Sequence, residues 1–225
     1  MRVVRSAVLS LFVPMVLFRT VSVGAAPSGV TPHATASQAT KVTFDTSDSR
    51  FTRGVDNQGW YSNRVDTRNQ NPNYLVGRCC FDDGNHETRD FFTFDLTDLT
   101  AHVVGASLEL PDAPRRDQAP LGQTLRFYEV TTPARRLNLN NGADEATFFD
   151  LGHGKRFGSF VVRRLDSPGV RTFELNARAM HAINEARGGF FSVGGRLVNM
   201  PANTAPFLFG GTTNAGRQRL IVQTG

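Results

Sequence analysis

The sequence has little of what a metal centre or a disulfide scaffold needs. Its 225 residues include only two cysteines, Cys79 and Cys80, and they are adjacent. Neighbouring Cα atoms lie about 3.8 Å apart, below the usual disulfide window of about 4.4 to 6.8 Å, so a bond between them would be strained. Two buried thiols, a strained vicinal disulfide and an intermolecular disulfide all stay open. A zinc site is not favoured, because no second cysteine pair or histidine cluster accompanies them.

Long apolar runs are also scarce, and the longest lies at the start of the chain. Arg2 and Arg5 precede an apolar stretch from Ala7 to Phe18, and small residues follow up to Ala25. This order predicts a secretory signal peptide over residues 1–25. The stretch spans about 12 residues, well short of the roughly 20 that cross a bilayer. We therefore expect a secreted protein with no membrane insertion after cleavage.

Lysine is rare, since only Lys41 and Lys155 accompany the arginines among the 25 basic residues. The formal net charge is +5, and the predicted signal peptide carries three arginines and no acid, so cleavage leaves about +2. A mature domain whose net charge is close to zero gives little reason to expect nucleic acid as a partner. Guanidinium groups suit carboxylates, but the arginine pairs are spread along the chain.

Alternating apolar residues predict an all-β fold. In residues 92–96 and 106–110 every second side chain is apolar: Phe92, Phe94, Leu96, Ala106, Leu108 and Leu110. Successive side chains of a strand point to opposite faces, so each run predicts a strand with one buried and one solvent-facing side. Further short strands are predicted at residues 42–44, 124–130, 158–163, 171–175, 191–194, 207–209 and 220–222.

One helix is predicted between two of these strands. Asn176 is a suitable N-cap, apolar residues at helical spacing run from Ala179 to Ala186, and Gly188 ends the segment. Residues 26–40 read as a flexible leader, and residues 41–225 as a single domain. The sequence as a whole predicts a jelly-roll-like antiparallel β-sandwich with one short helix.

A candidate ligand site surrounds the single tryptophan. Trp60 and Tyr61 follow Asp56 and Asn57, and Tyr74 comes shortly afterwards. Flat aromatic rings can cover the apolar face of a sugar while Asp and Asn bind its hydroxyl groups. In the alternative interpretation Trp60 fills one end of the sandwich and its indole N–H bonds to a loop.

Metal and catalytic signals are weaker. Asp82, Asp83 and Asn85 surround Gly84 and resemble an oxygen-rich calcium loop, although such turns are more often plain hairpin tips. No other cofactor is expected. His86 begins a string similar to HExxH, but Asp90 stands where the second histidine would be. No catalytic motif is present, so the sequence does not predict an enzyme.

The order of several segments resembles a family of exported bacterial β-sandwich proteins that often end in a PEP-CTERM sorting tail. The segments are GWY (59–61), NYLVG (73–77), RDFFTFDL (89–96), VVGASLEL (103–110), LRFYEVTTP (125–133), FDLGHGKRFGSF (149–160), FELNARAMHAINEARGGFFSVGG (173–195) and FLFGG (207–211). The family is similar, more distantly, to DNRLRE-type, carbohydrate-binding-like modules. The resemblance implies an extracellular surface or matrix protein. The chain lacks the Pro-Glu-Pro tail, so we expect release.

Three functions stay open. The favoured one is a secreted, non-catalytic module that binds glycan or another extracellular polymer. A structural or adhesive matrix protein without a small ligand is the first alternative. A polysaccharide hydrolase or lyase is the second, because a fold does not determine function. The sequence does not indicate the oligomeric state.

Overall fold

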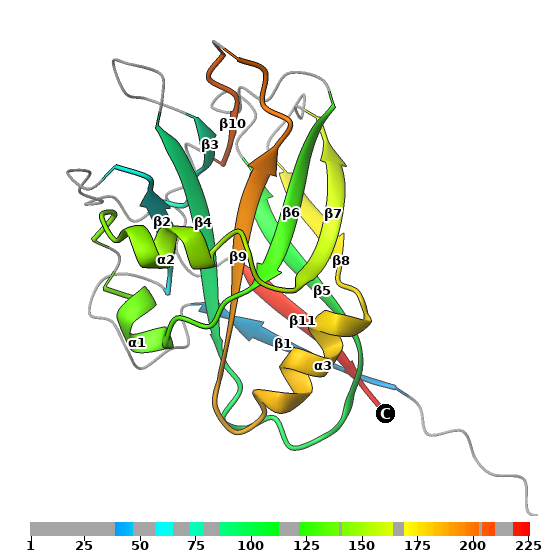
Figure 1. Ribbon diagram of the computed structural model, residues 1–225. Helices are drawn as coiled ribbons and strands as arrows, with labels where there is room; N and C mark the ends of the chain where they lie inside the picture. Colours follow the sequence, from blue (N-terminus) through cyan, green and yellow to red (C-terminus); the bar gives the residue numbers. More distant parts are fainter. Residues whose placement is uncertain are drawn as a thin grey trace, which may run out of the picture. The chain divides into compact units, whose positions relative to one another are not determined.

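The computed structural model describes residues 39–46, 57–64, 73–78, 86–112, 122–139, 141–163, 169–202, 204–209 and 218–225. In these residues the strands form two antiparallel sheets (Figure 1). The first sheet has the order β1-β11-β5-β8, with β1 at Thr40–Asp45, β11 at Arg219–Thr224, β5 at Val103–Asp112 and β8 at Gly169–Glu174.

The second sheet has the order β10-β3-β4-β9-β6-β7, and β2 also pairs with β4. Its strands are β2 (Gln58–Ser62), β3 (Val76–Arg78), β4 (Glu87–Asp95), β6 (Gln123–Glu129), β7 (Arg156–Val162), β9 (Phe190–Val198) and β10 (Phe207–Leu208). Strands β2 and β3 are short, and the sequence did not predict them as separate elements.

The strand order is that of a jelly roll. With β2, β3 and β10 set aside, successive strands alternate between the sheets except for β6 and β7, which pair with each other, and the first strand, β1, pairs with the last, β11. The first sheet then holds main strands 1, 8, 3 and 6, and the second holds 2, 7, 4 and 5. This arrangement confirms the predicted jelly-roll-like β-sandwich.

The main core lies between the two sheets and is rich in phenylalanine. Phe92 and Phe94 of β4 face Leu108 and Leu110 of β5, and all four side chains are fully buried. Burying a side chain of this size contributes about 1.5–3 kcal/mol. Phe127 of β6 joins them, so the face of β6 that carries Leu125 and Phe127 is the one that lies in the core.

The outer face of β4 departs from the prediction of a solvent-facing side. Thr93 is fully buried, and its hydroxyl lies 2.8 Å from that of Ser192 on β9. Phe91 is also fully buried, in a second apolar cluster with Tyr61, Leu137, Phe148 and Leu151. Two short helices bring the last three of these residues onto the sheet, so β4 is buried on both faces.

The two covering helices, α1 (Ala134–Leu137) and α2 (Glu145–Asp150), were not predicted, since each is too short to show an apolar stripe. Helix α3 (Ala177–Glu185) is confirmed. The side chain of its N-cap, Asn176, accepts hydrogen bonds from the backbone N–H groups of Arg178 and Ala179. Gly188 has φ +78°, as expected of a residue that ends a helix.

Among the described residues no helix is long and apolar enough to cross a membrane. The predicted signal peptide, nearly all of the predicted leader, and Cys79 with Cys80 lie outside the described residues. Strand β1 begins at Thr40, one residue before the predicted start of the domain.

Asp90 is a carboxyl group inside this apolar core. It is fully buried on the inner face of β4, opposite Gly195 of β9. A methyl group on Gly195 would stand 2.0 Å from Oδ1 of Asp90, so only glycine leaves room for the carboxyl. Burial raises the pKa of Asp90 from 3.8 to about 8, although the backbone N–H groups of Asp90 and Gly195 act in the opposite direction. Asp90 is therefore mostly protonated at neutral pH.

The raised pKa predicts how stability changes with pH. Between about pH 4 and pH 8 the folded chain keeps a proton on Asp90 that the unfolded chain releases, so rising pH favours unfolding by up to about 1.4 kcal/mol per pH unit. Asp90→Asn removes this contribution. We expect its stability relative to the unmodified protein to rise steadily across that range, measured by urea unfolding at several pH values. Asp98→Asn, at an exposed position, should show no such trend. If the difference in free energy of unfolding between Asp90→Asn and the unmodified protein does not change with pH, Asp90 is not a buried, protonated carboxyl.

Candidate functional site

Trp60 does not form an exposed binding platform. Its side chain is 5% exposed and packs with Leu75 and Phe207. The indole Nε1–H donates to Oδ1 of Asn73 over 3.2 Å. The expectation of an exposed stacking surface at Trp60 is therefore wrong; as in the alternative interpretation, the ring is buried and its indole N–H bonds to a loop residue.

The two predicted tyrosines are core residues as well. The hydroxyl of Tyr61 donates to the carbonyl of Leu137 over 2.8 Å and so joins β2 to α1. Tyr74 is fully buried, and its hydroxyl donates to the carbonyl of Pro111. Tyr61 lies in the cluster outside the second sheet and Tyr74 in the main core, so they do not share a surface with each other.

Asn57 has a structural role that the sequence did not reveal. It is buried, and its Nδ2 donates to the carbonyl of Thr46 over 2.7 Å. Its own carbonyl accepts from the backbone N–H of Thr93 over 2.8 Å. Asn57 thus ties the end of β1 in the first sheet to β4 in the second. Asp56, the remaining predicted ligand residue, lies outside the described residues.

The suggested calcium loop cannot be placed, because Asp82, Asp83 and Asn85 lie outside the described residues. In the described ranges, no three His, Cys, Asp or Glu side chains gather closely enough to hold a metal ion. His86 is buried, and its Nε2 lies 2.6 Å from Nη1 of Arg64.

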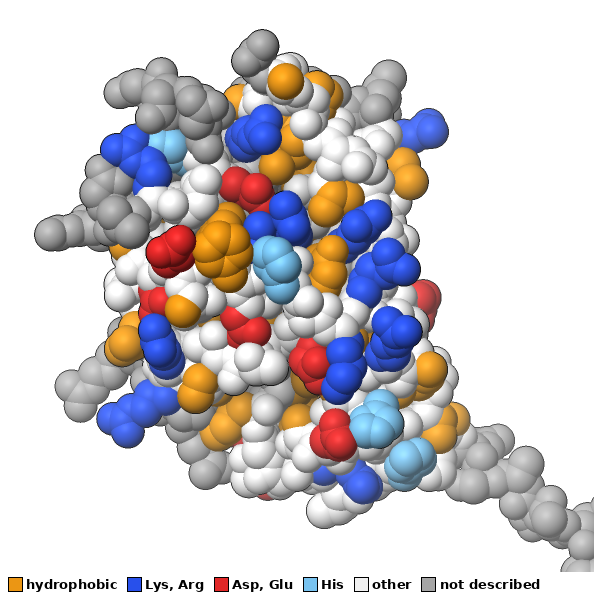
Figure 2. Space-filling view, in the orientation of Figure 1, with side chains coloured by type: hydrophobic (Ala, Val, Ile, Leu, Met, Phe, Trp, Pro, Cys, Tyr) orange, Lys and Arg blue, Asp and Glu red, His pale blue; other side chains and the backbone are white. Residues whose placement is uncertain are grey.

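A different group of side chains lies on the outer face of the second sheet. Figure 2 shows this side of the molecule, where basic side chains gather over β9, β6 and β7 beside an apolar patch and a histidine. We call this surface the arginine face and define it by Arg126, Arg196, Arg156, Phe149 and His153.

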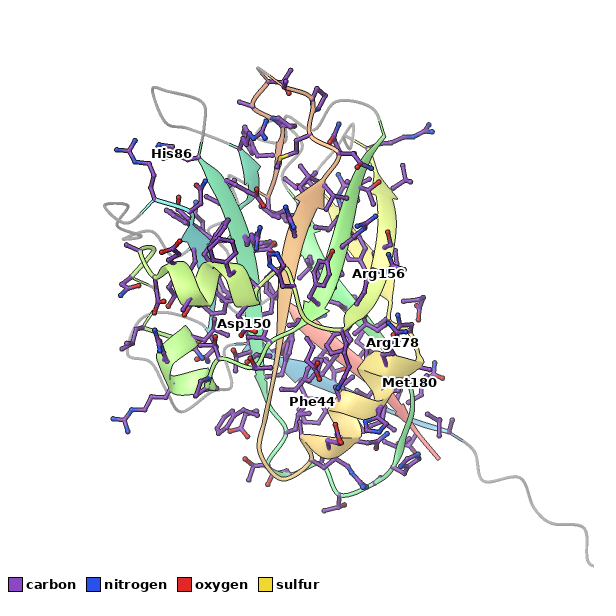
Figure 3. All side chains as sticks on the ribbon, in the orientation of Figure 1. Phe44, His86, Asp150, Arg156, Arg178 and Met180 are labelled. Carbon is purple, nitrogen blue, oxygen red and sulfur yellow. The ribbon has the colours of Figure 1, made fainter. Side chains whose placement is uncertain are left out.

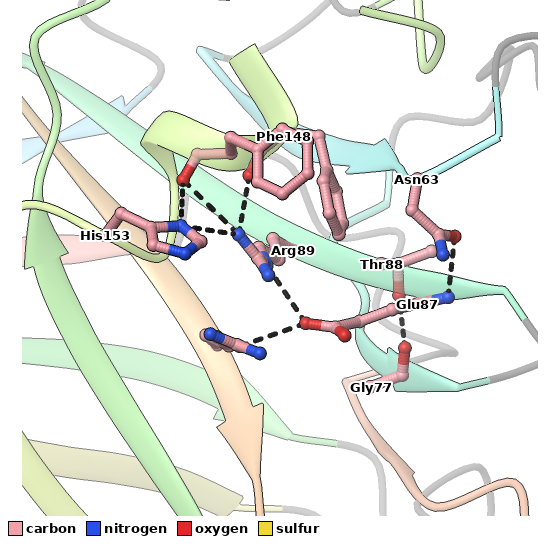
Figure 4. Close-up of polar contacts among 9 residues, drawn as sticks. Asn63, Gly77, Glu87, Thr88, Arg89, Phe148 and His153 are labelled. Carbon is pink, nitrogen blue, oxygen red and sulfur yellow. Dashed lines mark hydrogen bonds and ion pairs between the residues drawn. The ribbon is translucent and has the colours of Figure 1, made fainter. Parts of the chain in front are cut away.

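The arginine face rests on Arg89, which lies beneath it on β4 and is 2% exposed. Its Nη1 donates to the carbonyls of Phe148 (3.0 Å) and Phe149 (3.3 Å) near the end of α2, and its Nε donates to Oε1 of Glu87 over 3.0 Å (Figure 4). The guanidinium carbon stands 4.0 Å above the ring of Phe148. Burial lowers the pKa of Arg89, whereas Glu87 raises it.

Helix α2 reaches Arg89 because two glycines allow a close approach. A methyl group on Gly152 would stand 2.8 Å from Nη1 of Arg89, and one on Gly194 would stand 2.6 Å from the carbonyl oxygen of Leu151. The end of α2 is also fixed by Asp150, labelled in Figure 3, whose carboxylate accepts from the backbone N–H groups of Thr131 (2.9 Å) and Thr132 (2.6 Å).

Three arginines lie side by side across neighbouring strands of this face. Arg196 of β9 donates to the same Oε1 of Glu87 as Arg89 does, over 3.1 Å. Arg126 of β6 is directly opposite Arg196 in the strand register. The Nε of Arg126 is buried and makes no hydrogen bond to any residue that the structure describes. Glu87 is thus shared by two of the guanidinium groups, and Arg126 has no described carboxylate partner.

An exposed aromatic ring stands next to these charges. Phe149, on α2, is 48% exposed. Its ring centre lies 5.6 Å from that of His153, and its carbonyl lies 2.7 Å from Nδ1 of His153. The same Nδ1 also lies 3.3 Å from Nη1 of Arg89, which can only donate, so the contact with the carbonyl and the contact with Arg89 require opposite tautomers of the ring.

This arrangement suits the binding of a negatively charged group more than acid–base catalysis. Glu87 accepts from two arginines, and Asp150 accepts from the turn before α1. Both carboxylates of this region are therefore held by the protein itself. Arg126 and Arg196 instead offer guanidinium donors at the sheet surface, where carboxylate and sulfate groups bind well.

Comparison with known proteins adds no identification. No protein-family model matches the chain, and no curated protein is significantly similar to it. The resemblance to exported sandwich proteins stays a prediction, and functional inference rests on the arginine face.

The sequence signals for the arginine face were present but ambiguous. Arg126 alternates with Leu125 and Phe127, as any polar residue of a strand would, and nothing local shows that Arg196 lies opposite. Phe149 follows Phe148 directly, so the exposed ring could not be distinguished from the buried one. Only the strand register and the covering helix bring these residues together.

The burial of Trp60 and the exposure of Phe149 predict losses of stability of different size when each is replaced by alanine. Trp60→Ala should destabilise the fold by about 3–5 kcal/mol, the usual cost of emptying a large buried site. Phe149→Ala should change the free energy of unfolding by less than about 1 kcal/mol, because its ring is half exposed. Chemical denaturation of both variants measures the difference. Equal, small losses would mean that Trp60 is not a core residue.

Proposed function

We propose that this protein is a secreted, non-catalytic β-sandwich module that binds an acidic extracellular polymer at the arginine face. The observation that carries the proposal is the pairing of Arg126 with Arg196, two basic residues directly opposite each other in the register of adjacent strands. Like charges in that position destabilise a sheet. Arg196 is partly compensated by Glu87, whereas Arg126 has no described carboxylate partner, so the repulsion bears mainly on Arg126.

A bound anion offsets this repulsion. A carboxylate or sulfate group that lies between the two guanidinium groups gains charge-assisted hydrogen bonds from both. The cost in stability is therefore recovered only in the complex, which is a common property of binding sites.

The exposed Phe149 ring supports a sugar polymer as the ligand. An aromatic ring can cover the apolar face of a pyranose ring, while nearby charged groups orient its substituents. Arg89 and Asp150 both hold the last turn of α2, which carries Phe149. The ring is therefore presented on a rigid support, so little conformational entropy is lost on binding.

Binding to a panel of soluble polysaccharides tests this function. We expect binding to polygalacturonate, alginate or a sulfated glycan, and none to neutral dextran. Arg126→Gln should weaken binding about tenfold, because it removes a charge-assisted contact of roughly 1.5 kcal/mol. Affinity should also fall as salt is raised from low to physiological concentration. Isothermal titration calorimetry or affinity electrophoresis gives these values.

Arg219→Gln is the matched control, since Arg219 lies on β11 of the first sheet and is paired with Asp45. It removes the same charge from the other side of the sandwich and should leave the affinity unchanged. The proposal fails if no acidic polymer binds, or if Arg219→Gln weakens binding as much as Arg126→Gln does.

A further inference from the structure

A hollow beside the arginine face lies where the start of β7 meets the start of α3. It has a volume of about 580 Å³ and is lined by Lys155, Ala177, Arg178 and His181. This volume lies within the range of about 300–1,000 Å³ that small-molecule sites occupy. Of the described residues that line it, three carry basic groups and none carries a carboxylate.

The charges around the hollow are only partly neutralised. Lys155 donates to Oε1 of Glu129 over 3.0 Å, and Nδ1 of His181 lies 3.1 Å from Oε2 of Glu185. The guanidinium of Arg178 makes no hydrogen bond or ion pair with any residue in the described part of the chain, although its backbone N–H donates to Oδ1 of Asn176. Its guanidinium is therefore the donor group that an incoming anion would meet.

The walls of the hollow are held in place by hydrogen bonds between α3 and β7. The backbone N–H of Asn176 donates to the carbonyl of Phe157 over 2.9 Å. Its side-chain Nδ2 donates to the carbonyl of Arg156 over 2.9 Å. These two bonds fix the start of the helix against the strand that carries Lys155, so the hollow does not depend on a mobile loop.

The hollow also continues the arginine face. Arg156, on β7, pairs in register with Tyr128 of β6, whereas its chain neighbour Phe157 points into the core. Arg156 therefore lies on the outer surface together with Arg126. Arg156 and Arg178 are on the same side of the molecule (Figure 3), where Figure 2 shows a band of basic side chains.

We propose that this hollow is a second anion subsite, which receives the carboxylate or sulfate group of another sugar unit of the same polymer. The inference rests on the proposed function of the arginine face. Arg178 supplies the main charge, Lys155 adds a donor, and the ring of His181 lies at the rim. Ala177 and the aliphatic stem of Lys155 provide an apolar wall that suits a sugar ring better than a bare ion.

A polynucleotide fits these features less well. Single-stranded nucleic acids bind through several aromatic rings that stack on successive bases. In the described residues the exposed aromatic ring beside this band is that of Phe149, and the lining of the hollow has no aromatic carbocycle. Binding of a polynucleotide in preference to an acidic glycan would overturn the inference.

Titration of the ¹⁵N-labelled full chain with small probes tests the subsite separately from the polymer. Sodium sulfate and D-glucuronate are added in parallel at constant ionic strength, with D-glucose as the neutral probe. We expect saturable shifts of the backbone amides of residues 177–181 with at least one anion and none with glucose. A preference for sulfate or for glucuronate identifies which anionic sugar the subsite takes.

Substitutions then assign the shifts to Arg178. Arg178→Gln should weaken binding of the effective probe about tenfold, Arg178→Lys should retain most of it, and Arg219→Gln should have no effect. Arg178 is exposed, so these variants are expected to fold normally. Absence of shifts in residues 177–181, or equal shifts in Arg178→Gln, would overturn the subsite.

The experiments distinguish failure of the subsite from failure of the proposed function. If Arg126→Gln weakens polymer binding while Arg178→Gln leaves it unchanged, the arginine face stands and the subsite is wrong. If the small anions shift residues 177–181 but no polymer binds, the proposed function is wrong, and the subsite is overturned as part of a polymer site.

Discussion

The contact between Arg89 and the end of α2 positions the residues of the arginine face. A guanidinium that is almost fully buried cannot be left without partners, and Arg89 obtains them from Glu87 and from two carbonyls of the helix. The same contact holds α2 on the sheet, so that Phe148 is buried and Phe149 stays exposed. The outer surface of β4 is thereby covered by a second small core. The solvent-exposed part of the sheet is then formed by β9, β6 and β7, which carry Arg196, Arg126 and Arg156.

The surface that results combines two properties which the fold itself does not need. Arg126 and Arg196 repel each other across adjacent strands, and an aromatic ring stands in water on a rigid support. Each of these features costs some stability, whereas the jelly roll is amply held together by the phenylalanine-rich core between its sheets. We propose that both costs are recovered by one kind of ligand, a sugar chain that carries negative charges. The hollow at Arg178, on the same side of the sandwich, is the proposed second anion subsite for such a chain.

Local sequence signals were sufficient for the fold but not for the site. Alternation at Phe92, Phe94 and Leu108 and the N-cap at Asn176 are properties of neighbouring residues, and the elements that they predicted are present. Helices α1 and α2 escaped prediction because four to six residues give no periodicity. Trp60 suggested a ligand platform by its residue type alone, and residue type does not distinguish a core aromatic from an exposed one. The pairing of Arg126 with Arg196 depends on a strand register between distant segments, which no local pattern encodes.

The central claim is that ligands meet the outer face of the second sheet and not the end of the sandwich that holds Trp60. Hydrogen–deuterium exchange of the intact protein, with and without a saturating acidic oligosaccharide, tests it most directly. The account predicts slower exchange in residues 123–129, 148–156 and 190–198, and unchanged exchange in residues 58–62 and 207–209. Protection confined to the segments around Trp60, with none over β6 and β9, would contradict it.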